Sequence, residues 1–336
     1  MKKRYRSYGS YGVHTVNMFC CLNFYYASYT SYKSHNSYNP HRKRIVMRKL
    51  LLSILLGLTF SAFSEMQVDK PLSPFEERSI LLGLHRGGRD QWPENTLVAF
   101  KEAAKRWPDA LLELDVHATA DGQVVVIHDD SVDRTTNGTG MVWNMTFAEV
   151  RALDAAYQFT PDHGTTFPYR DQGITIPTLK EVLEVSPTHR FLIEMKDGDN
   201  VAAATVAAIR EADATDRCIL AAVPPQFIED ARTLAPEIAT CYDFLSAATM
   251  LNELRYGDWD HYTPEHKMVA LSPNLQERFN LTSAEIKALQ AKGILITFWT
   301  VNKEEEMRRL LKMGVDSILT DRPDALAAII AEQSNK

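Results

Sequence analysis

Short apolar runs alternate with amphipathic segments from about residue 79 to the end of the chain, and this alternation restricts the folds that the chain can adopt. Eight runs have the length and composition of buried strands: 80–85, 111–117, 191–196, 218–223, 238–242, 268–272, 294–300 and 317–320. The segments between them have helical periodicity, among them 96–106, 179–185, 201–211, 225–234, 284–292 and 303–313. Strands that alternate with helices form parallel sheets with the helices outside. Eight strands over about 240 residues fit a closed barrel better than an open sheet.

One pair of apolar runs lies too close together for a helix to connect them. The run 111–117 is followed by 124–128, and the intervening Asp121-Gly122 is typical of a hairpin turn. We therefore expect a β-hairpin that leaves the barrel. A turn centred on residues 121 and 122 would place His128 opposite Asp115.

Residues 130–177 follow the hairpin as a long insertion rich in Thr, Gly, Asp and Pro. Its one helix-like piece is 146–153, where Thr146 and Glu149 have the spacing of a capping box. Insertions at the catalytic face of a barrel often form lids or substrate walls. The expected fold class is thus α/β: a TIM-type (β/α)8 barrel with a β-hairpin excursion and a long loop insertion at the catalytic face.

Charge divides the chain near residue 64. Residues 1–64 contain ten of the 37 Lys and Arg residues and no Asp or Glu, so residues 65–336 contain 27 basic and 43 acidic side chains, a formal net charge of −16. Because residues 65–336 are this acidic, they lack the basic face on which nucleic-acid binding depends. If the substrate is an anion, positive charge must be supplied locally, and a metal ion is the simplest source.

The segment 47–64 has the three parts of a secretory signal peptide. Met47-Arg48-Lys49 is a short positive start, residues 50–60 are apolar, and Ser61-Ala62-Phe63-Ser64 supplies small residues just before Glu65. A bilayer core needs about 20 apolar residues, so this shorter stretch is not expected to act as an anchor. We expect a mature protein with no stable membrane span, exported to the periplasm or secreted.

The expected organisation therefore has three segments. Residues 1–46 hold eight of the 13 tyrosines and show no periodicity, so we interpret them as an untranslated or disordered leader. Residues 47–64 are the expected signal peptide, and 65–336 are expected to form a single barrel domain. Its two cysteines, Cys218 and Cys241, lie on apolar runs that favour buried free thiols, although export would permit a disulfide.

Three carboxylates lie on two of the expected strands. Glu113 and Asp115 are two residues apart and therefore point to the same face, and Glu194 repeats the pattern on the next barrel strand. Buried together, such carboxylates repel one another unless a cation lies between them. Oxygen ligands of this kind suit Mg²⁺ or Ca²⁺ better than zinc. The alternative is a network of salt bridges with Arg86 and Lys196.

Two histidines, His85 and His128, end apolar runs near these carboxylates. Imidazole titrates near neutral pH, so both are candidates for general acid and base. Asp129 either orients His128 or is an ordinary loop residue. The neighbouring Gly87 and Gly88 allow a ligand to approach the backbone, or simply make a strand-exit turn.

Other polar residues near the expected strand ends could contact a substrate. Arg86 and Lys196 offer a planar fork and a point charge, which suit a phosphate. Trp299 either walls a substrate pocket or packs in the core, and Glu94 could add a polar contact at the site. Helix capping is a complete explanation for Asn95-Thr96.

Seven motifs occur in order between about residues 80 and 325: HRGG…PENT, ELDV, VVIHDD, SVDRTTNGTG, IEMK, WTVN and GVDSILTDRP. Together they resemble the glycerophosphodiester phosphodiesterase family. The resemblance implies a barrel fold and hydrolysis of a small-molecule glycerophosphodiester to sn-glycerol 3-phosphate and an alcohol. It also implies attack by the glycerol 2-hydroxyl on phosphorus, giving a cyclic phosphate that water then opens.

The same resemblance implies roles for individual residues. One divalent cation, Ca²⁺ or Mg²⁺, would be held by Glu113, Asp115 and Glu194. The acid and base would be His85 and His128, in either order, and Arg86 and Lys196 would hold the phosphate.

Two other functions compete with this hypothesis. One is a phospholipase D-like enzyme that uses the same site on lysophospholipid or sphingomyelin head groups. It would need an exposed apolar surface, for which the insertion offers scattered candidates: Met141, Val142, Trp143, Phe147, Tyr157, Phe159, Phe167 and Tyr169. The other is a non-catalytic glycerophosphodiester-binding protein. It is disfavoured because every chemical position is filled.

Overall fold

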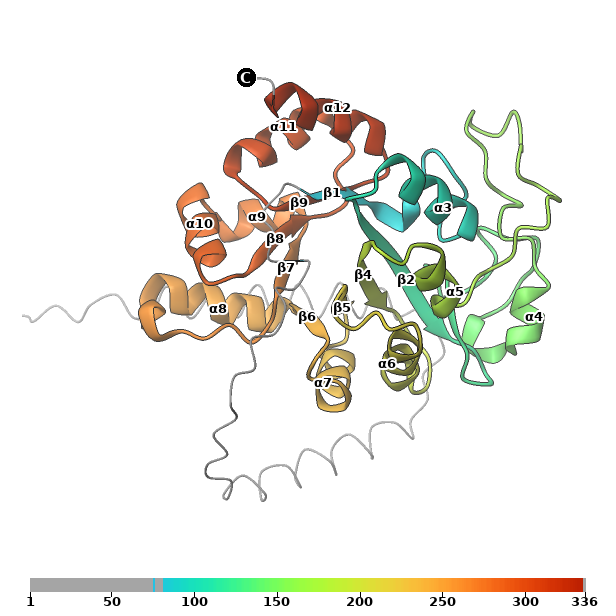
Figure 1. Cartoon of the computed structure of the whole chain (residues 1–336), viewed down its shortest axis with the longest axis horizontal. Helices are drawn as coiled ribbons and strands as arrows, with labels where there is room; N and C mark the ends of the chain where they lie inside the picture. Colours follow the sequence, from blue (N-terminus) through green and yellow to red (C-terminus); the bar gives the residue numbers. More distant parts are fainter. Residues whose placement is uncertain (1–74, 76–80, 335–336) are drawn as a thin grey trace, which may run out of the picture. The chain divides into compact units, whose positions relative to one another are not determined.

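Eight parallel strands close into a barrel in the computed structural model, which describes residue 75 and residues 81–334. The barrel strands are β1 (Leu81–Leu84), β2 (Leu111–Ala118), β4 (Arg190–Met195), β5 (Cys218–Ala222), β6 (Ala239–Tyr242), β7 (Met268–Leu271), β8 (Leu295–Phe298) and β9 (Ser317–Thr320). Each pairs with the next barrel strand, and β1 pairs with both β9 and β2, which closes the ring. Figure 1 shows the helices arranged around these strands. The predicted TIM-type barrel is confirmed.

Helices connect successive strands on the outside of the barrel. They are α3 (Leu97–Arg106), α5 (Leu179–Val185), α6 (Val201–Glu211), α7 (Pro225–Leu234), α8 (Phe244–Tyr256), α9 (Pro273–Phe279), α10 (Ser283–Ala291), α11 (Glu304–Met313) and α12 (Pro323–Ser334). The six helices expected from periodicity all form, within one residue of their expected bounds. Several begin at threonines whose side chains accept a hydrogen bond from the helix backbone, including Thr96, Thr178 and Thr282.

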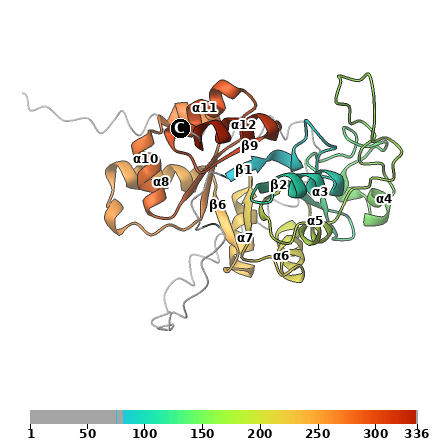
Figure 2. The same cartoon turned by 45° about the horizontal axis from the view of Figure 1, so that its top comes forward.

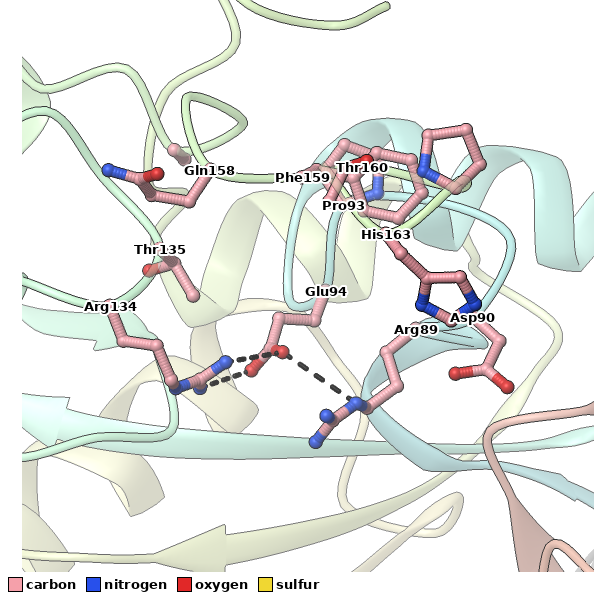
Figure 3. A pocket seen from close by; sticks show the side chains of 12 residues that line it. Arg89, Asp90, Pro93, Glu94, Arg134, Thr135, Gln158, Phe159, Thr160 and His163 are labelled. Atoms are coloured by element: carbon pink, nitrogen blue, oxygen red, sulfur yellow. Dashed lines mark hydrogen bonds and ion pairs between the residues drawn. The ribbon is translucent and has the colours of Figure 1, made fainter. Parts of the chain in front are cut away.

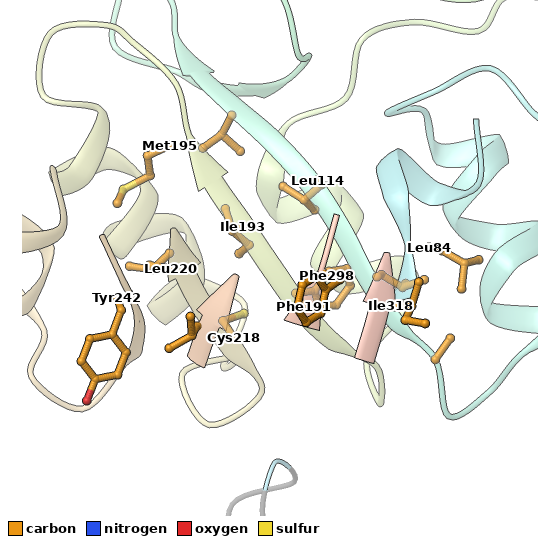
Figure 4. Packing of buried hydrophobic residues seen from close by; sticks show 14 of the residues in the cluster. Leu84, Leu114, Phe191, Ile193, Met195, Cys218, Leu220, Tyr242, Phe298 and Ile318 are labelled. Carbon is orange, nitrogen blue, oxygen red and sulfur yellow. The ribbon is translucent and has the colours of Figure 1, made fainter. Parts of the chain in front are cut away.

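Successive side chains of each strand point in opposite directions and enter two different apolar clusters. On β4, Phe191, Ile193 and Met195 face outward and pack with helix residues in the larger cluster, part of which Figure 4 shows. Between them, Leu192 faces the inside of the barrel. The inner cluster contains no helical residue, and its members are Phe75, Leu111, Leu192, Ile219, Cys241, Met268, Leu295 and Leu319. This period of two also carries the polar residues of the strand ends to the inside of the barrel.

The expected hairpin forms, but its predicted register is wrong by one residue. Strand β3 (Val124–Val126) pairs antiparallel with β2, with Val126 opposite Val116. Three residues rather than two make the turn, because the backbone N–H of Thr119 donates to the carbonyl of Gln123 at 2.9 Å and Gly122 adopts φ 82°. Asp115 therefore lies opposite Ile127, whose N–H donates to its carbonyl at 3.0 Å, and not opposite His128.

The insertion 130–177 lies beside α3 and α5, on the side of the barrel where Figures 1 and 2 show it in green. It contains the short turn η2 (Val142–Asn144) and α4 (Phe147–Arg151). The predicted capping box is present in α4, between Thr146 and Glu149. The insertion has its own apolar cluster with the hairpin: Val125, Ile127, Val132, Val142, Val150, Ala155 and Ile176.

Three further expectations concern the N-terminal segments, a membrane span and the two cysteines. The expected leader (1–46) and signal peptide (47–64) lie outside the described residues. Of the helices that the structure describes, none is both long enough and apolar enough to span a membrane. Cys218 and Cys241 are buried free thiols, as favoured from the sequence.

Candidate active site

The three carboxylates named from the sequence meet at the C-terminal ends of β2 and β4. Asp115 lies beside Glu194 in the parallel register of these strands, and Glu113 lies two residues earlier on the same face. One carboxylate oxygen from each lies within 4.8 Å of the others. Glu113 and Asp115 are only 4% and 1% exposed. Such a cluster of buried oxygen ligands has the chemistry of a hard-cation site.

Charge in this cluster is only partly balanced by protein cations. Lys196 Nζ lies 3.1 Å from Asp115 Oδ1 and 2.8 Å from Glu194 Oε2, so the alternative salt bridges are present. Burial opposes ionisation of Asp115, but Lys196 and other nearby cations lower its pKa. Burial and the charge of Asp115 raise the pKa of Glu113 well above its usual value. Burial and Asp115 thus both oppose ionisation of Glu113, and Arg86 only partly offsets them.

Arg86 directly follows β1, has a left-handed backbone conformation and contacts three nearby carboxylates through its backbone or side chain: Glu113, Glu94 and Asp115. It lies in the short turn η1 (His85–Gly87) with φ 53°, and its N–H donates to Glu113 Oε2 at 2.8 Å. Its guanidinium donates to Glu94 Oε1 at 2.9 Å, and its Nε lies 3.5 Å from Asp115. The adjacent Gly87 also has positive φ, and a Cβ there would lie 3.0 Å from the Cβ of Ala99. Close packing against α3 therefore explains that glycine.

Each of the two histidines is held by a carboxylate through Nδ1. His85 Nδ1 lies 2.6 Å from Asp321 Oδ1, and His128 Nδ1 lies 2.7 Å from Asp129 Oδ1. Among the described residues, neither Nε2 atom has a hydrogen-bond partner. Since a carboxylate accepts the Nδ1 proton, this arrangement leaves Nε2 of each ring available for proton transfer. For Asp129, the alternative of an ordinary loop residue is wrong.

Four residues near the site were not assigned there from the sequence. Asp321 follows β9, and Asn302 donates to its Oδ2 at 2.7 Å. His117 Nε2 lies 3.1 Å from the carbonyl oxygen of His128 and so supports the hairpin end. Arg134, on the insertion, binds Asp129. Asp321, Asn302 and Arg134 belong to the motifs GVDSILTDRP, WTVN and SVDRTTNGTG, which were the available signal.

The capping explanation was right for Thr96 and wrong for Asn95. Thr96 Oγ1 accepts from the N–H of Ala99 at 3.3 Å. The Asn95 side chain instead donates from Nδ2 to Asp115 Oδ2 at 3.0 Å, and Asn95 is buried. Its left-handed backbone, with φ 58°, turns the side chain toward the carboxylates rather than toward the helix.

A cavity of about 410 Å³ lies on the outer side of Glu94. Figure 3 shows Glu94 between Arg134 and Arg89, with Asp90 and His163 beside Arg89. The insertion contributes the opposite wall, from residues that include Gln158, Phe159 and Thr160. Glu94 therefore makes the polar contact suggested by the sequence, and the insertion walls a cavity beside the site.

Trp299 follows β8 and is 42% exposed. The alternative of core packing is therefore wrong. It does not line the cavity beside Glu94. Its indole is available to solvent at the C-terminal end of the barrel, where a substrate could contact it.

These features define a class of protein: a (β/α)8-barrel enzyme whose site combines a carboxylate cluster with two carboxylate-paired histidines. Residues 85–325 match the model of the glycerophosphoryl diester phosphodiesterase family. The chain belongs to this family.

Named relatives agree with the family match over most of the chain. A glycerophosphodiester phosphodiesterase of Caldanaerobacter subterraneus subsp. tengcongensis is 34% identical over 252 residues, which cover 73% of this chain and 96% of the relative. A putative glycerophosphoryl diester phosphodiesterase from Silicibacter pomeroyi has a TM-score of 0.60 at 26% identity, covering 76% of this chain and 95% of that one. A phosphodiesterase from Oleispira antarctica, in complex with the product sn-glycerol-3-phosphate, has a TM-score of 0.59 at 25% identity, covering 74% and 96%.

Proposed function

We propose that this chain hydrolyses glycerophosphodiesters to sn-glycerol 3-phosphate and an alcohol, using one divalent cation and two histidines. Membership of the family makes the chain a phosphoric diester hydrolase, a glycerophosphodiester phosphodiesterase. The product bound to the Oleispira antarctica relative supports the choice of product. The observation that carries the proposal is the convergence of Glu113, Asp115 and Glu194 next to two histidines paired with carboxylates.

The carboxylates fit a divalent cation, Mg²⁺ or Ca²⁺, held by Glu113, Asp115 and Glu194. Two observations support this fit. The pKa of Glu113 is raised, as expected for a carboxylate short of positive charge, and Asp115 Oδ1 accepts no hydrogen bond from the described residues although Lys196 Nζ lies 3.1 Å away. When bound, the cation supplies charge that stabilises the phosphoryl oxygens in the transition state.

The two histidines would move the protons. In the first half-reaction, Nε2 of one ring removes the proton of the glycerol 2-hydroxyl, whose oxygen bonds to phosphorus. The P–O bond to the leaving alcohol breaks, and the second ring protonates that oxygen. In the second half-reaction, water opens the cyclic phosphate and the two rings exchange roles. This role is supported in both His85 and His128 by the carboxylate that holds Nδ1, which leaves Nε2 of each ring free to transfer a proton.

Arg86 and Lys196 would bind the phosphate. Neighbouring carboxylates outweigh the effect of burial and raise the pKa of both side chains, so both remain cationic at neutral pH. Trp299 would wall the substrate pocket at the end of β8, where its indole is exposed. An intramolecular nucleophile on the substrate, already tethered to phosphorus, gains a large effective concentration.

Action on lipid receives less support from the insertion. Its eight apolar candidates for a lipid-contacting surface are all buried or half-buried. The described part of the insertion thus offers no exposed large apolar side chain from that set. Soluble glycerophosphodiesters are the substrates that we propose.

Location is a separate proposal. We propose that residues 47–64 direct export and that the mature protein begins near Glu65. N-terminal sequencing of active protein from the native host should find the start near Glu65, and retention of residues 1–46 in the active enzyme would contradict the proposal.

The main test measures sn-glycerol 3-phosphate released from a small panel of glycerophosphodiesters, with and without a chelator. We expect turnover that exhaustive chelation abolishes and that Mg²⁺ or Ca²⁺ restores. Full activity after metal analysis has verified that the metal is gone would contradict the metal proposal.

A second test uses a substrate analogue without the 2-hydroxyl. The analogue should bind but react far more slowly, and equal turnover of that analogue would refute the cyclic route. Activity on lysophospholipid vesicles alone would favour the phospholipase D-like alternative.

A further inference from the structure

Arg134, on the insertion, contacts two carboxylates that each hold a different residue of the site. Its Nε donates to Asp129 Oδ2 at 2.6 Å, and its Nη2 donates to Asp129 Oδ1 at 3.1 Å. Its Nη1 donates to Glu94 Oε2 at 2.9 Å, and its Nη2 also donates to Glu94 Oε1 at 2.7 Å. Every nitrogen of the guanidinium is therefore engaged, and Figure 3 shows its pairing with Glu94. A planar guanidinium can bind both oxygens of two carboxylates at once. A lysine ammonium can lie between two carboxylates, as Lys196 does here, but it has no planar fork with which to bind both oxygens of each.

We propose that Arg134 is a positioning residue that fixes His128 and Arg86 relative to one another through Asp129 and Glu94. The inference rests on the proposed function, which gives His128 a role in proton transfer and Arg86 a role in binding phosphate.

The first arm of this bridge leads to the proton-transfer group. Asp129 Oδ1 lies 2.7 Å from His128 Nδ1, so the direction of the Asp129 carboxylate sets the direction of Nε2 on the far side of the ring. Arg134 occupies both oxygens of Asp129 and thereby fixes that carboxylate. Hydrogen bonds from His128 and Arg134 outweigh burial and lower the pKa of Asp129, so it remains ionised as the acceptor.

The second arm leads to the phosphate-binding residue. Glu94 Oε1 accepts from Arg86 Nη1 at 2.9 Å, and Arg86 in turn contacts Glu113 and Asp115. The Glu94 side chain is 11% exposed and accepts hydrogen bonds from the guanidiniums of Arg86 and Arg134, with Arg89 Nε 3.8 Å away. Burial opposes its ionisation, but hydrogen bonds from Arg134 and the charge of Arg86 lower its pKa to about 2. Without Arg134, Glu94 and Asp129 would lose the cation that they share and would repel each other.

The loop that carries Arg134 does not depend on this side chain for its shape. Val132 N–H donates to the carbonyl of Gly140 at 3.0 Å, and Thr136 N–H donates to the carbonyl of Val132 at 3.2 Å. Ser131 forms a β-bridge with Met141, and Val132 is fully buried in the apolar cluster of the insertion. The backbone and this cluster therefore hold the loop without the Arg134 side chain. The bridge is better explained by what it aligns.

The experiment compares Arg134→Ala and Arg134→Lys with the control Arg151→Ala. Arg151 also lies in the insertion, has a side-chain exposure of 35% against 42% for Arg134, and makes a two-pronged pair with Glu181 at 2.7 and 2.6 Å. Turnover of a glycerophosphodiester and thermal unfolding are measured for each variant.

We expect Arg134→Ala to lower kcat through His128 and to raise KM through Arg86. The combined loss in kcat/KM should be on the order of tenfold to a hundredfold. Arg134→Lys should recover little of it, and Arg151→Ala should stay within about twofold.

Double variants test whether the effect passes through the two carboxylates. If Arg134 acts on kcat through Asp129, adding Arg134→Ala to Asp129→Asn should change kcat little further, and adding it to Glu94→Gln should change KM little further. Fully additive losses would overturn the inference. An unchanged kcat/KM in Arg134→Ala would also overturn it. So would an equal loss of kcat/KM in Arg151→Ala that accompanies an equal fall in Tm, because the loss would then reflect lower stability.

A third measurement separates this inference from the proposed function. Calorimetric binding of sn-glycerol 3-phosphate requires no turnover and reports on the Arg86 arm. We expect Arg134→Ala to weaken binding by about the factor by which KM rises. If the wild type turns over no glycerophosphodiester, the proposed function fails. The binding comparison still decides the role of Arg134, because equal affinity in wild type and variant would overturn it.

Discussion

The inside of the barrel changes from apolar to ionic along the same strands. On β2, Leu111 belongs to the inner apolar cluster, while Glu113 and Asp115 lie two and four residues further along the same face. On β4, Leu192 is followed in the same way by Glu194. One period-two pattern thus supplies the packed end of the barrel and the chemical end.

The two ends use burial for opposite purposes. Toward the N-terminal end, burial of apolar side chains of the inner cluster, such as Leu111 and Leu192, stabilises the fold directly. At the C-terminal end, burial works against charged side chains, and the pKa of Glu113 is raised by burial and by the charge of Asp115. A local rule of folding is therefore broken at the end where the site lies, as is usual for functional sites.

The largest expected effect lies at the ionic end and concerns rate rather than stability. His85→Ala and His128→Ala should each lower kcat by about a hundredfold or more, because on the proposed mechanism each removes a group that transfers a proton. Metal affinity, measured by calorimetry, should stay near that of the wild type. Near-normal activity in either variant would remove that histidine from the proton-transfer assignment.

A matched pair on β4 tests the comparison directly. Leu192→Ala should cost about 2–5 kcal/mol of unfolding free energy, because it opens a cavity in a packed layer. Glu194→Gln, two residues further on, should change stability by about 1 kcal/mol or less but weaken metal binding and turnover. Urea unfolding and activity per folded molecule measure the two effects. If Leu192→Ala lowers activity per folded molecule as much as Glu194→Gln does, the two ends are not functionally distinct.

Properties encoded by local periodicity were predictable from the sequence. The strand and helix pattern predicted the barrel, and the two-residue spacing of Glu113 and Asp115 predicted that both face inward. The hairpin register failed because Asp121-Gly122 did not reveal that the turn contains three residues. A single residue in turn length moves every pairing of the hairpin.

Contacts between distant segments of the chain were not predictable in this way. The partner of His85 is Asp321, which lies 236 positions further along the chain, and no periodic signal joins the two. The role of Asn95 depends on a left-handed backbone that directs its side chain to Asp115, whereas its sequence context suggested a helix cap. Arg134 was visible only as one letter of a motif, because its bridge requires the folded insertion.

A smaller effect is expected from acid. The pKa of Glu94 falls from 4.5 to about 2 on folding, so its ion pairs contribute stability above pH 4.5 that is lost as the pH falls toward about 2. Glu94→Gln should therefore show a shallower loss of stability across this window than the wild type. Denaturant unfolding at several pH values measures the slope, and Leu192→Ala serves as the control. Parallel slopes for Glu94→Gln and wild type would contradict the coupling.

The smallest expected effect belongs to the apolar regions. Cys241 lies in the inner cluster and Cys218 in the outer one, and both are free. Burial raises the pKa of Cys218 to about 12 and also raises that of Cys241, so neither thiol forms the reactive thiolate at neutral pH. A variant beginning at Glu65, which lacks the leader cysteines, should react with a thiol reagent only when unfolded, and then at two sites. A reductant should leave its Tm unchanged. A fall in Tm on reduction would mean that a disulfide supports the packed end, so that packing alone does not account for its stability.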